Sequence, residues 1–126
     1  MYCFQPITID ELKDIIASTK IKYSTVDDIP VSLLKTVIST SVSEILMTVN
    51  QSLYTGIFPS CLKQSHITPI IKDAKGDPDS LSNYRPVIDL SFLSKILEKT
   101  VLRQLIPHLE TNSLLHPHQS AYNKKS

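Results

Sequence analysis

Glycine is scarce in this chain, since only Gly56 and Gly76 occur among its 126 residues. Loops that cradle phosphate groups need several glycines, because their backbone amides must come close to the ligand. The sequence therefore excludes a P-loop and a Rossmann fingerprint. Its two cysteines, Cys3 and Cys61, are too few for a disulfide framework and lack the paired spacing of a zinc site. We expect an intracellular protein in a reducing compartment.

Long apolar runs and a strong charge of one sign are also missing. No segment approaches the length needed to cross a bilayer, and the amino terminus does not have the pattern of a signal peptide, so we expect no membrane partner. The formal net charge of +1 neither supports nor excludes a nucleic-acid partner, because phosphate binding depends on a clustered basic face. With 41% hydrophobic and 20% charged residues, the composition is that of a globular domain.

Catalytic and metal-binding patterns are absent from the sequence. No serine, cysteine or threonine has a histidine and a carboxylate at the spacing of a hydrolase. Asp27 and Asp28 stand just before Pro30, where a helix is predicted to begin, so capping of that helix is favoured over metal binding. His116 and His118 have no third ligand nearby. We expect no catalytic residue and no metal site.

Apolar residues at helical spacing predict three helices in the first half of the chain. The segment Thr8 to Glu11 matches a capping box, and it opens a helix that ends near residue 19. A second helix is predicted after Pro30. The third begins at another capping box, from Ser41, and ends at Gly56, where a left-handed helix end favours glycine.

The second half of the chain predicts two strands and a long helix. The segment from His66 to Lys72 is β-branched and roughly alternating, which predicts a strand, and a second strand is predicted from Arg85 to Leu90. Pro69 makes the first an edge strand, and residues 73–82 form a surface loop. A helix of about five turns follows Ser91. Its predicted apolar stripe is Leu93, Ile96, Leu97, Val101, Leu105 and Leu109. The predicted fold class is α+β and mostly helical, with a short antiparallel strand pair packed with amphipathic helices.

The most distinctive chemistry comes from two cations on the two predicted strands. The planar guanidinium of Arg85 suits two phosphate oxygens, and the compact ammonium of Lys72 suits one. Together they could grip a triphosphate or a backbone phosphate. The alternative is that both are solvated and paired with Asp73 or Asp89, and spacing alone favours that alternative.

Other side chains have two interpretations that the residues alone leave open. Lys95, Lys99 and Arg103 recur every four residues, which suits contact with a nucleic-acid backbone and equally suits a solvated helix face. Tyr84 and Tyr122 could stack on bases or pack against their own surroundings.

A longer series of motifs runs in order along nearly the whole chain, from Phe4 to Ser126. It comprises Asp28-Ile29-Pro30, Leu33-Leu34-Lys35, Asn50-Gln51-Ser52-Leu53, Gly56-Ile57-Phe58-Pro59, Leu62-Lys63, Pro69-Ile70-Ile71-Lys72, Asn83-Tyr84-Arg85-Pro86, Leu93-Ser94-Lys95-Ile96-Leu97-Glu98-Lys99 and Gln119-Ser120-Ala121-Tyr122. This ordered series resembles the non-LTR (LINE-type) retrotransposon reverse transcriptases. It is more specific than any single motif.

The resemblance implies a place in the right-hand polymerase fold. Residues 1–60 would be a helical amino-terminal extension, and residues 61–126 part of the fingers, truncated before the palm. In the family, the lysine of Pro-Ile-x-Lys and the arginine of Tyr-Arg-Pro approach the triphosphate of the incoming nucleotide, which implies nucleotide binding by Lys72 and Arg85. The nucleic-acid contacts that the resemblance implies are Asn83, Tyr84, Lys95, Gln119 and Tyr122.

The chain also departs from the family pattern. Asn123 stands where family members usually carry arginine, and Val87-Ile88-Asp89 replaces the usual polar continuation after Arg-Pro. The first departure removes an anion contact from the Gln119 motif. The second is consistent with decay of an inserted copy of such an element.

The palm aspartates of the family, including the Tyr/Phe-x-Asp-Asp turn, do not occur in this sequence. Polymerisation requires the Mg²⁺ ions that these aspartates hold. We therefore expect a chain that is catalytically silent alone and that binds no cofactor, with Mg²⁺, RNA template and DNA primer belonging to the full-length enzyme. The alternative is a non-catalytic RNA-binding protein or interaction remnant. As a fragment, the chain is expected to self-associate through exposed apolar helix faces.

Overall fold

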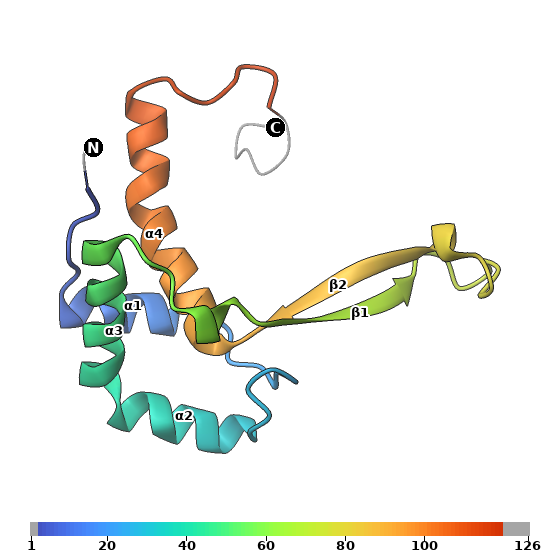
Figure 1. Cartoon of the computed structure of the whole chain (residues 1–126), viewed down its shortest axis with the longest axis horizontal. Coiled ribbons are helices and arrows are strands. Elements are labelled where there is room, and N and C mark those ends of the chain that lie inside the picture. Colours follow the sequence, from blue (N-terminus) through green and yellow to red (C-terminus); the bar gives the residue numbers. More distant parts are fainter. Residues whose placement is uncertain (1–2, 120–126) are drawn as a thin grey trace.

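The computed structural model describes residues 3–119, which form four α-helices and one two-stranded antiparallel sheet (Figure 1). The elements in chain order are α1 (Ile9–Ala17), α2 (Val31–Thr40), α3 (Val42–Thr55), the 3-10 turn η1 (Ser60–Lys63), β1 (Ser65–Ile71), the 3-10 turn η2 (Leu81–Asn83), β2 (Tyr84–Leu90) and α4 (Phe92–Thr111). The helices gather into one body, and the β1–β2 hairpin projects away from it. The predicted α+β class is confirmed.

Local signals set the start of α1 and the end of α3 as predicted. The Thr8 hydroxyl accepts a hydrogen bond from the Glu11 backbone amide at 3.2 Å. Gly56 has a φ of 69°, the left-handed conformation in which glycine is unstrained. The second predicted capping box is wrong, because Ser41 has a φ of −115° and its side chain makes no capping bond. Ser41 flanks two helices, directly after the last residue of α2 and directly before the first residue of α3.

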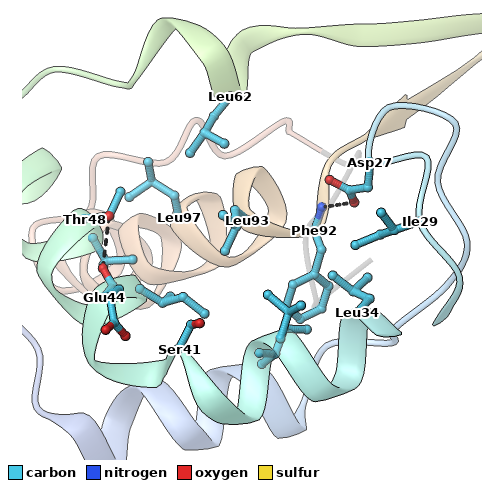
Figure 2. Close-up of a pocket in the computed structure, with 14 residues that line it drawn as sticks. Asp27, Ile29, Leu34, Ser41, Glu44, Thr48, Leu62, Phe92, Leu93 and Leu97 are labelled. Carbon is cyan, nitrogen blue, oxygen red and sulfur yellow. Dashed lines mark hydrogen bonds between the residues drawn. The ribbon is translucent and has the colours of Figure 1, made fainter. Parts of the chain in front are cut away.

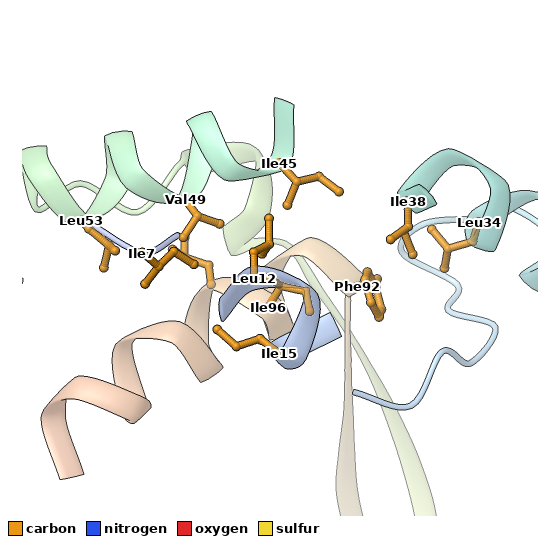
Figure 3. Close-up of a cluster of buried hydrophobic side chains, with 11 residues drawn as sticks. Ile7, Leu12, Ile15, Leu34, Ile38, Ile45, Val49, Leu53, Phe92 and Ile96 are labelled. Atoms are coloured by element: carbon orange, nitrogen blue, oxygen red, sulfur yellow. The ribbon is translucent and has the colours of Figure 1, made fainter. Parts of the chain in front are cut away.

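The hydrophobic core lies among the four helices (Figure 3). Leu12 of α1 and Ile96 of α4 are both 0% exposed, and each fully buried side chain of this size stabilises the fold by roughly 1.5–3 kcal/mol. The buried hydrophobic residues of the described chain are Ile7, Leu12, Ile15, Leu34, Ile38, Ile45, Val49, Leu53, Phe92, Ile96 and Leu97. None of them belongs to β1 or β2. Packing therefore holds the helices together, while the hairpin lies outside the core.

The buried face of α4 differs from the predicted stripe. Phe92, Ile96 and Thr100 are buried, whereas Leu93, which the stripe placed in the core, is 37% exposed. Along α4 no side chain beyond Thr100 is buried. The carboxyl-terminal half of this helix thus extends past the core, so the predicted stripe is wrong for Leu93, and Leu105 is only half-buried.

Two side-chain amides hold the segment that precedes α1. Asn50 of α3 accepts from the Ile7 amide at 2.8 Å and donates to the Ile7 carbonyl at 3.1 Å. Gln104 of α4 forms the same pair of bonds with Gln5, at 2.8 and 2.7 Å. Each amide satisfies both backbone polar groups of one residue, as a neighbouring strand would. The segment is thereby tied to both α3 and α4.

The division into two parts at residue 60 stays a prediction. Helix α4, which follows residue 60, packs against α1 and α3, which precede it.

Among residues 3–119, no single helix has the length and apolar character of a membrane span. Only α2 and α3 taken together, as a pair bent by 77°, meet those criteria of length and composition.

Candidate anion-binding hairpin

The strand register brings the two predicted phosphate-binding cations together. Ile70 is paired with Arg85, and the Lys72 amide donates to the Asn83 carbonyl at 2.8 Å, which extends the ladder by one pair. Because alternate side chains of a strand share a face, Lys72 and Arg85 lie on the same face as diagonal neighbours. The Cβ atoms of such neighbours are typically about 7 Å apart. This spacing suits two contacts to one polyphosphate.

Both cations are exposed and have capacity for a ligand. The Nζ atom of Lys72 donates one hydrogen bond, to the Ser82 carbonyl at 3.0 Å, which leaves two protons. The Arg85 guanidinium forms no hydrogen bond or ion pair with any residue from 3 to 119. Within the same range Asp73 and Asp89 accept hydrogen bonds from other groups. The alternative pairing of the two cations with these carboxylates is therefore not found in the described chain.

The loop between the strands is ordered by its own polar groups. The Asp73 and Asp77 carboxylates each accept a hydrogen bond from the backbone amide two residues later, both at 3.0 Å. Gly76 fits this turn because a Cβ atom there would lie 3.1 Å from the Asp73 carbonyl oxygen. These carboxylates thus act as turn residues.

Asn83 and Tyr84, two of the predicted nucleic-acid contacts, also hold this loop. The Asn83 side-chain amide donates to the Asp77 carbonyl at 3.0 Å. The Tyr84 hydroxyl donates to the Pro78 carbonyl at 2.8 Å, and both side chains are half-buried. Packing against its own surroundings is therefore the observed role of Tyr84 in the free chain.

The remaining predicted contacts lie elsewhere. Lys95 is half-buried in the first turn of α4, at the base of the hairpin. Lys99 donates to the Ser18 carbonyl at the end of α1, at 3.0 Å, so the predicted stripe of lysines is not one free helix face. Gln119 follows α4, with its backbone amide bonded to the His116 carbonyl. Tyr122 lies outside the described residues.

Strand length separates Lys95 from the cation pair. Arg85 lies five residues before Leu90, which is at the hairpin base, a distance of roughly 17 Å at the usual rise of a strand. A single nucleotide is too short to contact both places. A stretch of several nucleotides is long enough.

A polar cluster at the base of the hairpin was not predicted from the sequence. The Asp89 carboxylate accepts from the Thr25 amide at 2.9 Å and from the Thr25 and Ser24 hydroxyls, both at 3.1 Å. The Nδ1 atom of His66, which pairs with Asp89 across the strands, lies 2.7 Å from the Thr25 hydroxyl oxygen. Partial desolvation raises the pKa of Asp89, but these hydrogen bonds and the charge of Lys95 outweigh it and lower the pKa overall.

Asp27 caps a different helix from the one predicted. Its carboxylate accepts from the backbone amide of Phe92, the first residue of α4, at 2.9 Å (Figure 2). The predicted helix, α2, begins after Pro30 without any side-chain cap. Asp28 has a φ of 49°. Its carboxylate accepts a hydrogen bond from the Tyr23 hydroxyl at 3.1 Å, and this bond raises the pKa of Tyr23. The prediction that Asp27 caps a helix is therefore correct, but the helix is α4 and not α2.

An apolar groove of about 320 Å³ lies between α2, α3 and the start of α4 (Figure 2). Its lining residues are Asp27, Ile29, Leu34, Val37, Ile38, Ser41, Glu44, Ile45, Thr48, Val49, Leu62, Phe92, Leu93 and Leu97. Two carboxylates and no cation occur among them. The groove is therefore suited to an apolar group and unsuited to phosphate, which leaves the hairpin as the candidate anion site.

Within residues 3–119, no three histidine, cysteine, aspartate or glutamate side chains are grouped to hold a metal ion.

Comparison with known proteins identifies no relative, since no family model, no curated protein and no solved structure matches this chain. The resemblance to reverse transcriptases therefore stays a prediction from the ordered motifs.

Proposed function

We propose that this chain is the fingers part of a non-LTR (LINE-type) reverse transcriptase, in which Lys72 and Arg85 bind the triphosphate of the incoming nucleotide. The ordered motifs support this proposal. The observation that carries it is the placement of the two cations as diagonal neighbours on one exposed face of the hairpin. A hydrogen bond to a charged group contributes about 1.5–3 kcal/mol, and the guanidinium fork adds geometric selectivity for phosphate.

The role proposed for this chain is binding and orientation. The sequence has no Tyr/Phe-x-Asp-Asp turn, and residues 3–119 offer no grouped carboxylates that fit two Mg²⁺ ions. Mg²⁺ would be held by the palm of a full-length enzyme and would stabilise the charge that develops on the phosphates. We expect this chain to add no nucleotide to an annealed primer and template. Extension of the primer by the purified chain would contradict the proposal.

A second candidate function is non-catalytic RNA binding. It is favoured by the distance of roughly 17 Å between Arg85 and the hairpin base, where Lys95 begins the next helix. Cations spread over that length match a stretch of nucleic-acid backbone better than they match one nucleotide. Binding of this kind depends on counterion release and weakens as salt increases.

Two ligands, a deoxynucleoside triphosphate and a single-stranded RNA oligonucleotide, separate the two functions. The test variant is Lys72→Ala with Arg85→Ala. The control is Lys13→Ala with Lys35→Ala, which removes the same charge from exposed positions on α1 and α2. We expect the test variant to weaken triphosphate binding by about tenfold or more, because it loses two charge-assisted contacts, and the control to bind like the wild type.

RNA binding gives a different result if the second function applies. The slope of log affinity against log salt should then fall by about 1.4 in the test variant, because each phosphate contact to a single strand contributes about 0.7. Triphosphate binding would be weak in every protein. If both variants bind both ligands as the wild type does, neither function belongs to Lys72 and Arg85.

A further inference from the structure

The hairpin is joined to the helical body by polar contacts at its base. Within the described chain, no strand residue belongs to the hydrophobic core. The strand residues His66, Asp89 and Leu90 instead bond to Ser24 and Thr25, in the segment between α1 and α2. The direction in which the hairpin projects therefore depends on a few hydrogen bonds at one end of it (Figure 1).

We propose that Thr25 acts as a latch that fixes the direction of the hairpin relative to the helices. It would do so by bonding to both strands at once, to His66 of β1 and to Asp89 of β2. Thr25 is then a positioning residue for Lys72 and Arg85, and this last step rests on the proposed function. The latch itself does not depend on that function.

The chemistry of the three side chains makes Thr25 the central member. A carboxylate only accepts hydrogen bonds, so the Thr25 hydroxyl proton is directed to Asp89 at 3.1 Å. The Thr25 oxygen then accepts from the Nδ1–H group of His66 at 2.7 Å, which sets the histidine tautomer. The Thr25 backbone amide adds a third bond, to the same Asp89 oxygen. Loss of the hydroxyl would remove the Thr25 bond to His66 of β1 and one of the two Thr25 bonds to Asp89 of β2.

The same segment is anchored to the helical body. Two residues after Thr25, the Asp27 carboxylate accepts from the Phe92 amide at the start of α4. Ser24 is 2% exposed, and its carbonyl accepts from the Asp28 amide at 2.9 Å, while its hydroxyl bonds to Asp89 and Leu90 of β2. The latch therefore connects the strands to a part of the chain that is itself fixed.

Strand length turns a small change at the base into a large displacement at the cation pair. A seven-residue strand is roughly 23 Å long, so a tilt of about 10° at the base moves the far end by about 4 Å. Lys72 follows the last residue of β1 at that far end. A shift of this size exceeds a hydrogen-bond length, and in a full-length enzyme it would move both cations together relative to the rest of the nucleotide site.

The latch can be tested by measuring a distance between spin labels on the full chain. Labels are attached at Met47→Cys on α3 and Leu81→Cys in the hairpin loop, since these positions are 72% and 88% exposed. Cys3 and Cys61 are changed to serine. With Thr25 present, we expect one narrow distance distribution. Thr25→Val should at least double its width, and Thr25→Ser, which keeps the hydroxyl, should restore it.

Thr36→Val is the matched control. It removes the same hydroxyl from α2, where that group bonds only to the Ser32 carbonyl of its own helix. We expect its distance distribution to remain narrow. Equal widths for wild type, Thr25→Val and Thr36→Val, with unchanged far-ultraviolet circular dichroism, would overturn the latch. If Thr25→Val does not fold, Asp89→Leu decides, because it removes the oxygen that accepts from Thr25 at a similar side-chain size, and an unchanged width would again overturn the proposal.

Triphosphate binding measured on the same variants distinguishes the latch from the proposed function. Because Lys72 and Arg85 lie on the same hairpin and move together, we expect Thr25→Val to bind triphosphate like the wild type and Lys72→Ala with Arg85→Ala to bind it weakly. If neither the wild type nor any variant binds triphosphate, the proposed function is wrong. A broadened distance distribution in Thr25→Val would then still support the latch.

Discussion

At the scale of single residues, Asp89 gives the fold a dependence on pH. Its folded pKa lies below the ordinary value, although partial desolvation opposes this, because Thr25 and Ser24 donate to the carboxylate and Lys95 lies nearby. A lowered folded pKa means that the charged carboxylate stabilises the fold above the unfolded pKa of about 4, and that this contribution is lost as the pH falls further.

Urea unfolding of wild type and Asp89→Asn at a series of pH values tests this prediction. We expect the wild type to have the larger free energy of unfolding by a constant amount from about pH 5 to pH 7, with the difference shrinking below about pH 4. His66 is paired with Asp89 across the strands, but its Nδ1 atom contacts the Thr25 hydroxyl and not the carboxylate. A difference that stays constant down to the lowest pH would show that Asp89 is not stabilised as a carboxylate.

The sequence predicted residue roles where both partners are close along the chain. Thr8 caps α1 through an amide three residues away, and that bond was predicted. Asn50 bonds to a residue 43 positions away, Asp89 to one 64 positions away and Asp27 to one 65 positions away. Nothing in the composition around these residues indicates which distant backbone group they meet. Their roles follow from tertiary packing.

At the scale of elements, the two prolines of the hairpin protect its edges. Pro69 and Pro86 are paired, and the Lys72–Asn83 bond three residues further along sets which pairs are hydrogen-bonded. Hydrogen-bonded and non-hydrogen-bonded pairs alternate along an antiparallel ladder, so the proline pair is a non-hydrogen-bonded one. The backbone N–H and C=O positions of such a pair point away from the partner strand. Because proline has no N–H, each outer edge lacks a donor near its centre, and pairing with the edge of another chain is interrupted.

Restoring the donors should make the hairpin prone to aggregation. Pro69→Val with Pro86→Val supplies an outward N–H on both edges and raises strand propensity. We expect faster growth of thioflavin T fluorescence and more sedimentable material than in the wild type. Pro107→Ala with Pro117→Ala, which changes two prolines outside the sheet, serves as the comparison. Equal aggregation of both double variants would show that the edge prolines have no protective role.

Element type was more predictable than element environment. The β-branched, roughly alternating residues from His66 to Lys72 predicted the first strand, and the spacing of three and four predicted α4, because these periods depend only on local geometry. The face that becomes buried was less predictable. Phe92 and Leu93 are adjacent and both apolar, yet only Phe92 is buried, since the position of α4 against α1 and α3 decides between them. For the candidate site, the two cations were predicted and the cluster that orients their hairpin was not.

At the scale of the whole molecule, the chain exposes more surface than its size requires. Its accessible surface is 9431 Å², whereas a compact monomer of 14.1 kDa exposes about 6,700 Å². The difference of roughly 2,700 Å² is comparable to the area buried in a large protein interface. Apolar side chains contribute to it, including Met47, Tyr54 and Leu81, which are 72%, 91% and 88% exposed. Such surfaces favour association.

The hairpin face opposite Lys72 and Arg85 is one place where copies should associate. Ile67 and Ile88 are paired on it and are 63% and 60% exposed. Because the prolines interrupt edge pairing, we expect contact through this face, with a dependence on protein concentration. Sedimentation velocity should show larger species as the concentration rises, together with binding of a dye that fluoresces on apolar surfaces.

Two matched pairs of substitutions locate the contact. Ile67→Ser with Ile88→Ser should shift the association to higher concentration, because it removes two exposed apolar side chains from one face. Ile70→Ser with Val87→Ser removes two from the opposite face, where these residues are 41% and 38% exposed, and should leave the association close to that of the wild type. If the wild type sediments as one compact monomer at every concentration and binds no dye, its excess surface does not drive association. If the two pairs have equal effects, the contact does not lie on the Ile67–Ile88 face.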